Sequence, residues 1–199
     1  RCMALLNALL RPFQLWNDLV LPIGRWISIV AIALMVVAIL IQVFFRYVLN
    51  NALPWPDEAA RFMMLWLTGL MAPIAFRQGG FVAIDMVVQA LPMRLGQIVS
   101  ILLLIISAGV LALAVNIGWG EVTGFGGKFK SASLYVPISF DLSEWLRVPR
   151  SWMMTSLLVG VVLLFIVNIE LILRSLITLL GGGDRLRELA PADDEVLAE

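Results

Sequence analysis

The chain contains no histidine and a single cysteine, Cys2, and only 14% of its 199 residues are charged. Without histidine it can offer no imidazole ligand to a metal or a haem, and no histidine proton relay. One cysteine excludes an internal disulfide bond and a multi-cysteine metal site. The formal net charge of zero gives no basic signature for nucleic acid. The sequence therefore predicts no cofactor, no metal site and no nucleic-acid partner.

What is abundant is apolar surface. Hydrophobic residues make up 61% of the chain, and the mean hydropathy is +0.98. Charged residues interrupt this composition at a few points and leave four apolar runs, at about 26–47, 57–77, 95–120 and 150–172. As a helix, each run extends about 30 Å or more, enough to cross the hydrocarbon core of a bilayer. We predict an all-α integral membrane protein with four transmembrane helices in a single membrane domain, 1–180, and a polar, disordered tail at 181–199.

Two further segments suit helices that lie in the membrane interface. In residues 1–22, polar side chains recur at helical spacing on one face, namely Asn7, Arg11, Gln14 and Asp18. Pro12 is expected to break this segment into two pieces, and the alternative is a poorly ordered leader into the first span. The charges argue against a removable signal peptide. The second amphipathic segment, 81–92, follows the second span and contains Asp85 and Gln89.

The most informative stretch joins the first span to the second. Pro56 suits the first turn of a new helix, where its missing N–H costs nothing. Asp57 and Glu58 follow in that turn, where the helix dipole favours negative charge. Arg61 is four residues after Asp57 and three after Glu58, so it shares a helix face with both. The second span therefore begins with a cluster of opposite charges at the membrane rim.

This cluster allows two interpretations. It is either a solvated helix start, in which each pair contributes a few tenths of a kcal/mol, or a buried lock between spans, with Arg46 as a second cation. We favour the lock because Arg61 lies a turn inside the membrane, where an unpaired charge is costly.

The same stretch resembles the small membrane subunit, called DctQ-like, of tripartite ATP-independent periplasmic (TRAP) transporters. The matching positions, with Asp57 added, are our candidates for structural or partner-interface residues: Arg46, Tyr47, Trp55, Asp57, Glu58, Arg61, Trp66, Gly69, Arg77 and Asp85. Gly79 and Gly80 also match, and a looser match follows at Ser131, Leu134 and Pro137. The family often has a histidine after the glycine pair, where this chain has Phe81, so any role of that histidine is absent here.

The resemblance implies partners as well as a fold. It implies a larger membrane subunit with the substrate and sodium sites, and a soluble periplasmic protein that delivers a carboxylate-bearing solute. The chain itself would be a non-catalytic scaffold in the bacterial inner membrane, with no catalytic, substrate-binding or metal-binding residues of its own, and would contribute to docking of the periplasmic protein. An ion gradient, not ATP, would drive uptake.

Four spans place both termini on one side of the membrane. That side carries eight Lys and Arg residues against six on the other, which favours cytoplasmic termini by the positive-inside rule. The family resemblance implies the same orientation. The largest extramembrane loop, 120–150, would then be periplasmic.

The polar inventory of the spans argues against transport by this chain alone. The central portions hold Gln42, Asn116 and Asn168, but no acid or base, and the acids near a membrane boundary, such as Glu170, lie at rims. A lone Asn or Gln in a span more often bonds a neighbouring helix than a ligand. Arg174 is expected to snorkel to the interface. Two other classes stay open, a self-contained small oligomeric transporter and the membrane anchor of a redox enzyme.

Overall fold

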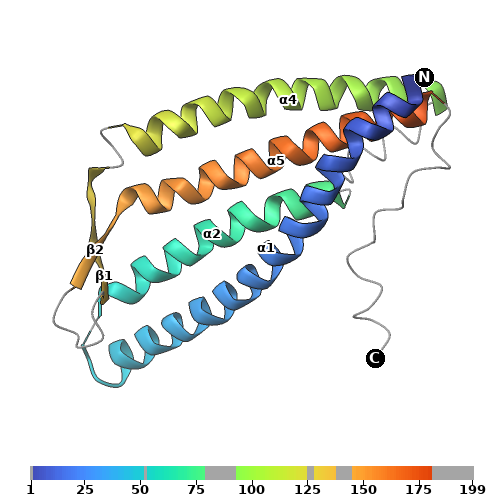
Figure 1. Ribbon diagram of the computed structural model, residues 1–199. Coiled ribbons are helices and arrows are strands. Elements are labelled where there is room, and N and C mark those ends of the chain that lie inside the picture. Colours follow the sequence, from blue (N-terminus) through green and yellow to red (C-terminus); the bar gives the residue numbers. More distant parts are fainter. Residues whose placement is uncertain (1, 52, 79–92, 125–127, 138–144, 181–199) are drawn as a thin grey trace, which may run out of the picture. The chain divides into compact units, whose positions relative to one another are not determined.

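The computed structural model describes residues 2–51, 53–78, 93–124, 128–137 and 145–180. Within these ranges the chain forms four long helices, α1 (Cys2–Tyr47), α2 (Trp55–Arg77), α4 (Met93–Thr123) and α5 (Arg150–Leu179) (Figure 1). Each contains a segment long and apolar enough to cross a membrane. The predicted all-α class with four spanning helices is confirmed, and the structure adds a two-stranded sheet between α4 and α5.

The first helix is longer than the sequence suggested. Residues 2–22 continue directly into the first span, and Pro12 and Pro22 both lie inside α1. The prediction that Pro12 breaks the segment is therefore wrong. An internal proline removes one backbone hydrogen bond, whereas ending the helix in apolar surroundings would leave several groups unpaired. The second predicted interfacial segment, 81–92, and the tail, 181–199, lie outside the described residues.

The connection from α1 to α2 is short and uses asparagine. Asn50 has a φ of 49°, in the left-handed region that asparagine tolerates better than most residues. The N–H of Asn51 donates to the carbonyl of Phe45 over 3.0 Å, which satisfies one of the carbonyls left open at the helix end. As predicted, α2 then carries Asp57 and Glu58 in its first turn.

The chain divides into two compact units. The first takes in Arg1–Pro22, Ala72–Leu113 and Val162–Glu199, and the second takes in Ile23–Met71 and Ala114–Val161. The first unit thus contains the beginnings of α1 and α4 and the ends of α2 and α5, while the second contains the opposite ends.

Glycines mark the places where helices of the second unit touch. Gly24 of α1 lies against Leu70 of α2, where an added Cβ would be 3.7 Å from the Leu70 side chain. Gly118 of α4 lies against Leu158 of α5, where the corresponding distance is 3.2 Å. Together with the contact between α2 and α5 described next, these contacts give the helix order α1, α2, α5, α4 in this unit (Figure 1).

The closest approach is between α2 and α5. A Cβ added to Gly69 would lie 2.5 Å from the carbonyl oxygen of Ser156, and one added to Gly160 would lie 2.7 Å from the Cα of Gly69. Backbone therefore packs directly on backbone at this crossing. Small residues at such crossings are how membrane helices gain close van der Waals contact without a hydrophobic driving force.

The sheet between α4 and α5 is an antiparallel hairpin of β1 (Lys130–Pro137) and β2 (Trp145–Pro149). Its inner face buries Val148 and Leu134, which pack with Ala59 and Phe62 of α2. The sequence analysis treated this segment only as a loop. The reason is the irregular register between Lys130 and Tyr135, which interrupts the alternation that identifies a strand.

The glycine crossing gives the first prediction. Gly69→Ala or Gly160→Ala should push α2 and α5 apart and lower the free energy of unfolding by about 1–3 kcal/mol, the usual cost of overpacking. Thermal unfolding of the purified chain in mild detergent measures this. The matched control is Gly109→Ala in α4, where an added Cβ meets nothing within 4 Å, so stability should hold or rise. Equal effects at Gly69 and Gly109 would contradict the backbone contact.

Candidate functional site

The first unit contains a buried carboxylate. Glu170, near the end of α5, has no exposed surface at all. Its own helix supplies one partner, because Arg174 is four residues further on and shares its face. The Nε of Arg174 donates to Oε1 of Glu170 over 3.0 Å, and Arg174 is itself only 9% exposed.

Two other helices supply further hydrogen-bond donors to Glu170. Arg77, the last residue of α2, donates from Nη2 to the same oxygen, Oε1, over 2.9 Å. The amide Nδ2 of Asn17, on α1, donates to the other oxygen, Oε2, over 2.6 Å. Both carboxylate oxygens thus accept charge-assisted hydrogen bonds, the strong kind.

A second acid extends the cluster towards the surface. Arg77 also donates from Nη1 to Oδ1 of Asp18 over 2.7 Å, and the Asp18 side chain is 38% exposed. Negative and positive groups alternate along the series Asp18, Arg77, Glu170, Arg174, so the four charges sum to zero. We call these four residues with Asn17 the charge cluster. Since it draws on α1, α2 and α5, it fixes how these three helices meet.

The energetics of such a cluster are asymmetric. Burying ions costs several kcal/mol per ion, and close pairing with hydrogen bonds offsets that cost without a large net gain. Removing one member leaves its partner charged and buried, which is strongly destabilising. The cluster therefore specifies one arrangement of the three helices more than it adds to overall stability.

The position of Glu170 along α5 indicates the depth of the cluster in a membrane. Glu170 is twenty residues from the start of α5 at Arg150, about 30 Å at 1.5 Å per residue. That distance matches the thickness of the hydrocarbon core. With the fourth span beginning at Arg150, as the sequence predicts, the cluster would lie at the rim and not at the midplane, where transporters hold substrates and coupling ions.

The sequence analysis named Asp18, Arg77, Glu170 and Arg174, but it did not predict that they associate. It placed Glu170 at a rim, which stays a prediction. It also expected Arg174 to snorkel to the interface, which is wrong, because Arg174 is only 9% exposed and bonds Glu170. Arg174 turns to Glu170 because a buried carboxylate is a stronger partner than the interface. Asp18 was assigned to the leading segment without a partner, and Asn17 was not singled out. Two features of the sequence could have indicated the association. Glu170 and Arg174 are spaced i,i+4, and the predicted topology puts residues 1–22, Arg77 and the end of the fourth span on the same side of the membrane.

The predicted rim cluster at the start of α2 looks different from the charge cluster. Asp57 and Arg61 are exposed on this chain, while Glu58 is half-buried and has an interaction partner. Arg46 is exposed and lies 5.9 Å from the ring centre of Tyr47. This chain alone therefore does not bury Arg61, and the lock between spans stays a prediction.

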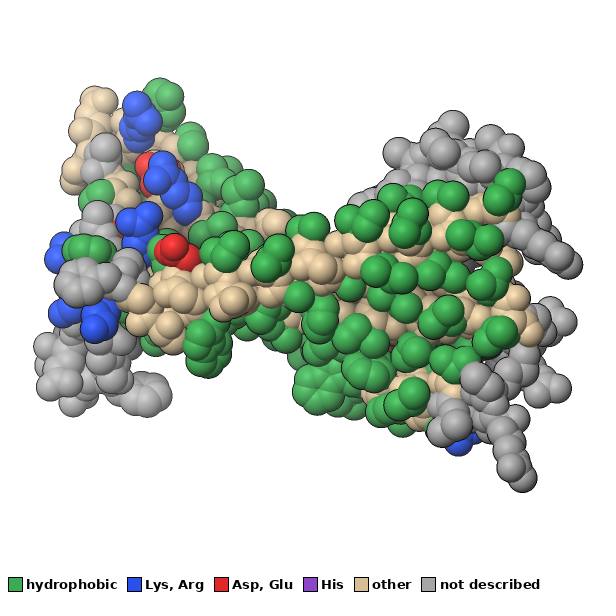
Figure 2. Space-filling model, turned by 90° about the horizontal axis from the view of Figure 1, so that it is seen from above, with side chains coloured by type: hydrophobic (Ala, Val, Ile, Leu, Met, Phe, Trp, Pro, Cys, Tyr) green, Lys and Arg blue, Asp and Glu red, His purple; other side chains and the backbone are tan. Residues whose placement is uncertain are grey.

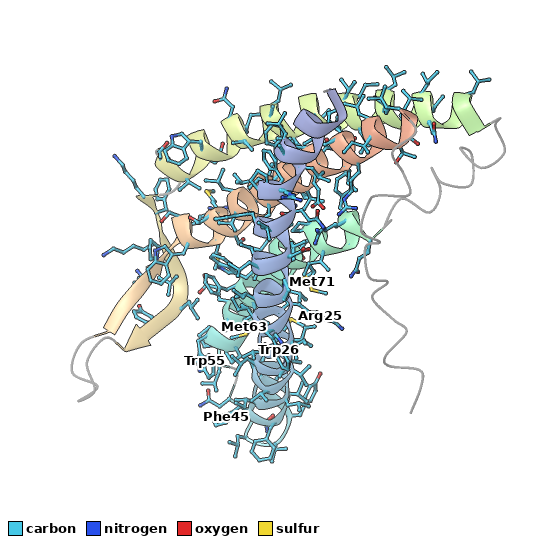
Figure 3. All side chains as sticks on the ribbon, turned by 45° about the vertical axis from the view of Figure 1, so that its right-hand side comes forward. Arg25, Trp26, Phe45, Trp55, Met63 and Met71 are labelled. Atoms are coloured by element: carbon cyan, nitrogen blue, oxygen red, sulfur yellow. The ribbon has the colours of Figure 1, made fainter. Side chains whose placement is uncertain are left out.

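The other candidates fall in several places. Trp55 begins α2 and is 40% exposed (Figure 3). Trp66 is half-buried, and its ring centre lies 6.3 Å from that of Phe62 in a tilted arrangement. Its indole Nε1 has no hydrogen-bond partner among the described residues. Gly69 is the glycine of the close crossing with α5. Asp85 lies outside the described residues.

Four long apolar helices, with the described internal charges compensated within the charge cluster, define a small multi-pass membrane protein. The family model "Tripartite ATP-independent periplasmic transporters, DctQ component" matches residues 35–178, nearly three quarters of the chain. The chain belongs to this family and is a small membrane subunit of a TRAP transporter. A comparison with curated proteins found no match. Arg77, Glu170 and Arg174 lie inside the matched range, whereas Asn17 and Asp18 precede it.

The charge cluster gives the second prediction. Glu170→Ala should strand Arg77 and Arg174 and lower the free energy of unfolding by about 3 kcal/mol or more. Denaturant unfolding of the purified chain in detergent measures this. Glu121→Ala, at an exposed acid near the end of α4, is the control and should change little. The double variant Glu170→Gln with Arg174→Gln, which removes a charge of each sign, should recover part of the loss. If Glu170→Ala is as neutral as the control, the cluster does not hold the helices.

Proposed function

We propose that this chain is the non-catalytic scaffold of a sodium-gradient-driven importer of carboxylate-bearing solutes in the bacterial inner membrane. It would hold the large membrane subunit, which carries the solute and sodium sites, and would contribute to docking of the periplasmic binding protein. Both termini would be cytoplasmic. Membership in the family supports a tripartite system, and the following observations support the scaffold role.

The observation that carries the proposal is the exposure of whole apolar helices. In α4 none of the most apolar window is buried within the chain, and in α1 only 11% is, against 33% in α5. A chain that transports alone must enclose a path with its own helices. Here α1 and α4 direct most of their apolar surface outward, towards lipid and, in the proposal, towards the large subunit.

The charge cluster supports the same conclusion. Guanidinium groups are the usual binders of a solute carboxylate. In this chain Arg77 already binds Asp18 and Glu170, and Arg174 binds Glu170. A solute would have to displace these carboxylates at a buried site. Among the described residues, no group of three acids, cysteines or histidines is placed to hold a metal ion.

The third prediction tests the scaffold role by reconstitution. Titration of the isolated chain with sodium and with a panel of organic acids should give no thermal shift. Vesicles that contain the large subunit and the binding protein should take up solute only when this chain is included. Saturable uptake by vesicles that hold this chain alone would contradict the proposal, and so would full uptake without it.

The fourth prediction concerns orientation. Gln78, just after α2, and Glu121, in the last turn of α4, are both exposed, and the proposed topology puts them at opposite sides of the membrane. In a Cys2→Ser background, Glu121→Cys should react with a membrane-impermeant maleimide added to spheroplasts, and Gln78→Cys should react only after lysis. The reverse pattern would place the termini outside the cytoplasm.

A further inference from the structure

The hairpin has two chemically distinct faces. Directly opposed residues of an antiparallel pair project to the same face, and so do residues two apart on one strand. Lys130 opposes Pro149, and Tyr135 opposes Arg147. Lys130, Tyr135 and Arg147 therefore share one face, while Val148 projects to the other. Val148 is 1% exposed, so its face is the inner one and the face with the two cations is the outer one.

Two further cations, Lys128 and Arg150, lie at the base of the hairpin. The backbone N–H of Arg150, the first residue of α5, donates to the carbonyl of Phe129 over 2.8 Å. That bond brings Arg150 beside Lys128 and Lys130. All three side chains are exposed, and so is Arg147, whose guanidinium lies 5.3 Å from the ring centre of Tyr135.

Aromatic residues mark the depth of this surface relative to the membrane. Trp119, in the last turns of α4, is 63% exposed, and Trp152, in the first turn of α5, is 47% exposed. Tryptophans at helix ends sit at the headgroup level of a bilayer. Phe129 lies between Lys128 and Lys130 and is 59% exposed. Figure 2 shows Lys and Arg side chains gathered with hydrophobic ones at the hairpin.

We propose that the lipid-binding rim, formed by Lys128, Phe129, Lys130, Arg147 and Arg150, binds the headgroups of anionic phospholipids. Lys and Arg side chains close to a membrane surface attract anionic headgroups in whichever leaflet holds them, and an exposed phenylalanine between two lysines can insert among acyl chains. Asp57, Glu58 and Glu121 lie at the same helix ends and reduce the positive charge without reversing it, since Arg46 and Arg61 lie there too.

A lipid fits these observations better than an acidic soluble protein does. Arg150 lies in the first turn of α5, two residues before Trp152, and its backbone bond to Phe129 holds the two lysines near that helix start. A soluble partner would also leave the exposed Phe129 ring in water when unbound, whereas lipid covers it at all times. The proposal does not depend on the scaffold role, because lipid selectivity belongs to this chain in any bilayer.

The test measures lipid selectivity of the purified full chain. Native mass spectrometry from mixed micelles should show retention of phosphatidylglycerol over phosphatidylcholine, and high salt should weaken it. Lys128→Gln with Lys130→Gln should lower that selectivity by about thirtyfold, from about fivefold per cation removed. Lys128→Arg with Lys130→Arg keeps both charges and should retain it. Phe129→Ala, which leaves every charge in place, should lower retention of both lipids.

The control removes the same number of charges elsewhere. Arg11 and Arg25 are both exposed on α1, and Arg25 projects away from the helix (Figure 3). Arg11→Gln with Arg25→Gln should leave the selectivity within about twofold of the unchanged chain. If this control loses as much as the lysine pair, net charge and not the rim selects the lipid, and the proposal fails. The proposal also fails if the Lys128→Gln, Lys130→Gln variant keeps its lipid selectivity. If that variant loses binding of the periplasmic protein instead, the lysines serve a protein partner and not a lipid.

Discussion

The arrangement of this protein depends on one desolvated carboxylate. Glu170 has no access to water, so its charge is tolerable only while Arg77, Arg174 and Asn17 hold it from three helices. The two arginines depend on Glu170 in turn, since a guanidinium buried without an acid is as costly as an acid buried without a guanidinium. The helices α1, α2 and α5 therefore have few alternative arrangements in the first unit. Asp18 connects the series to solvent and balances the last charge.

The second unit reaches a defined arrangement by a different means. There, Gly69 and Gly160 let the backbones of α2 and α5 touch, and no charge is needed at the crossing. A missing Cβ allows the two backbones to come into van der Waals contact, but it does not by itself select which helix face is the partner. Charge pairing specifies partners in one unit, and close packing specifies distance in the other. Both involve the surfaces of α2 and α5, whereas most of the apolar surface of α1 and α4 stays exposed on this chain.

The hairpin shows how a short segment can serve two environments. Its inner face closes over the beginning of α2 with Val148 and Leu134, while its outer face presents cations beside the first turn of α5. Strand alternation separates these two chemistries with a period of two residues, which a helix of the same length could not do so sharply. A chain that belongs to a transporter thus carries, outside its spans, a surface suited to the edge of the membrane.

The sequence by itself determined the membrane class, the four spanning helices and the family. Long uncharged runs have one stable outcome in a bilayer, and the residues from Arg46 to Asp85 carried the resemblance. It also located the beginning of α2 at Asp57 and Glu58, because helix starts are governed by neighbouring residues. Only the tertiary structure joined Asp18, Arg77 and Glu170, which are up to 152 positions apart along the chain, and only it showed that α1 continues through Pro12. Pairing of distant charges depends on which helix faces meet, and local patterns of sequence do not encode that.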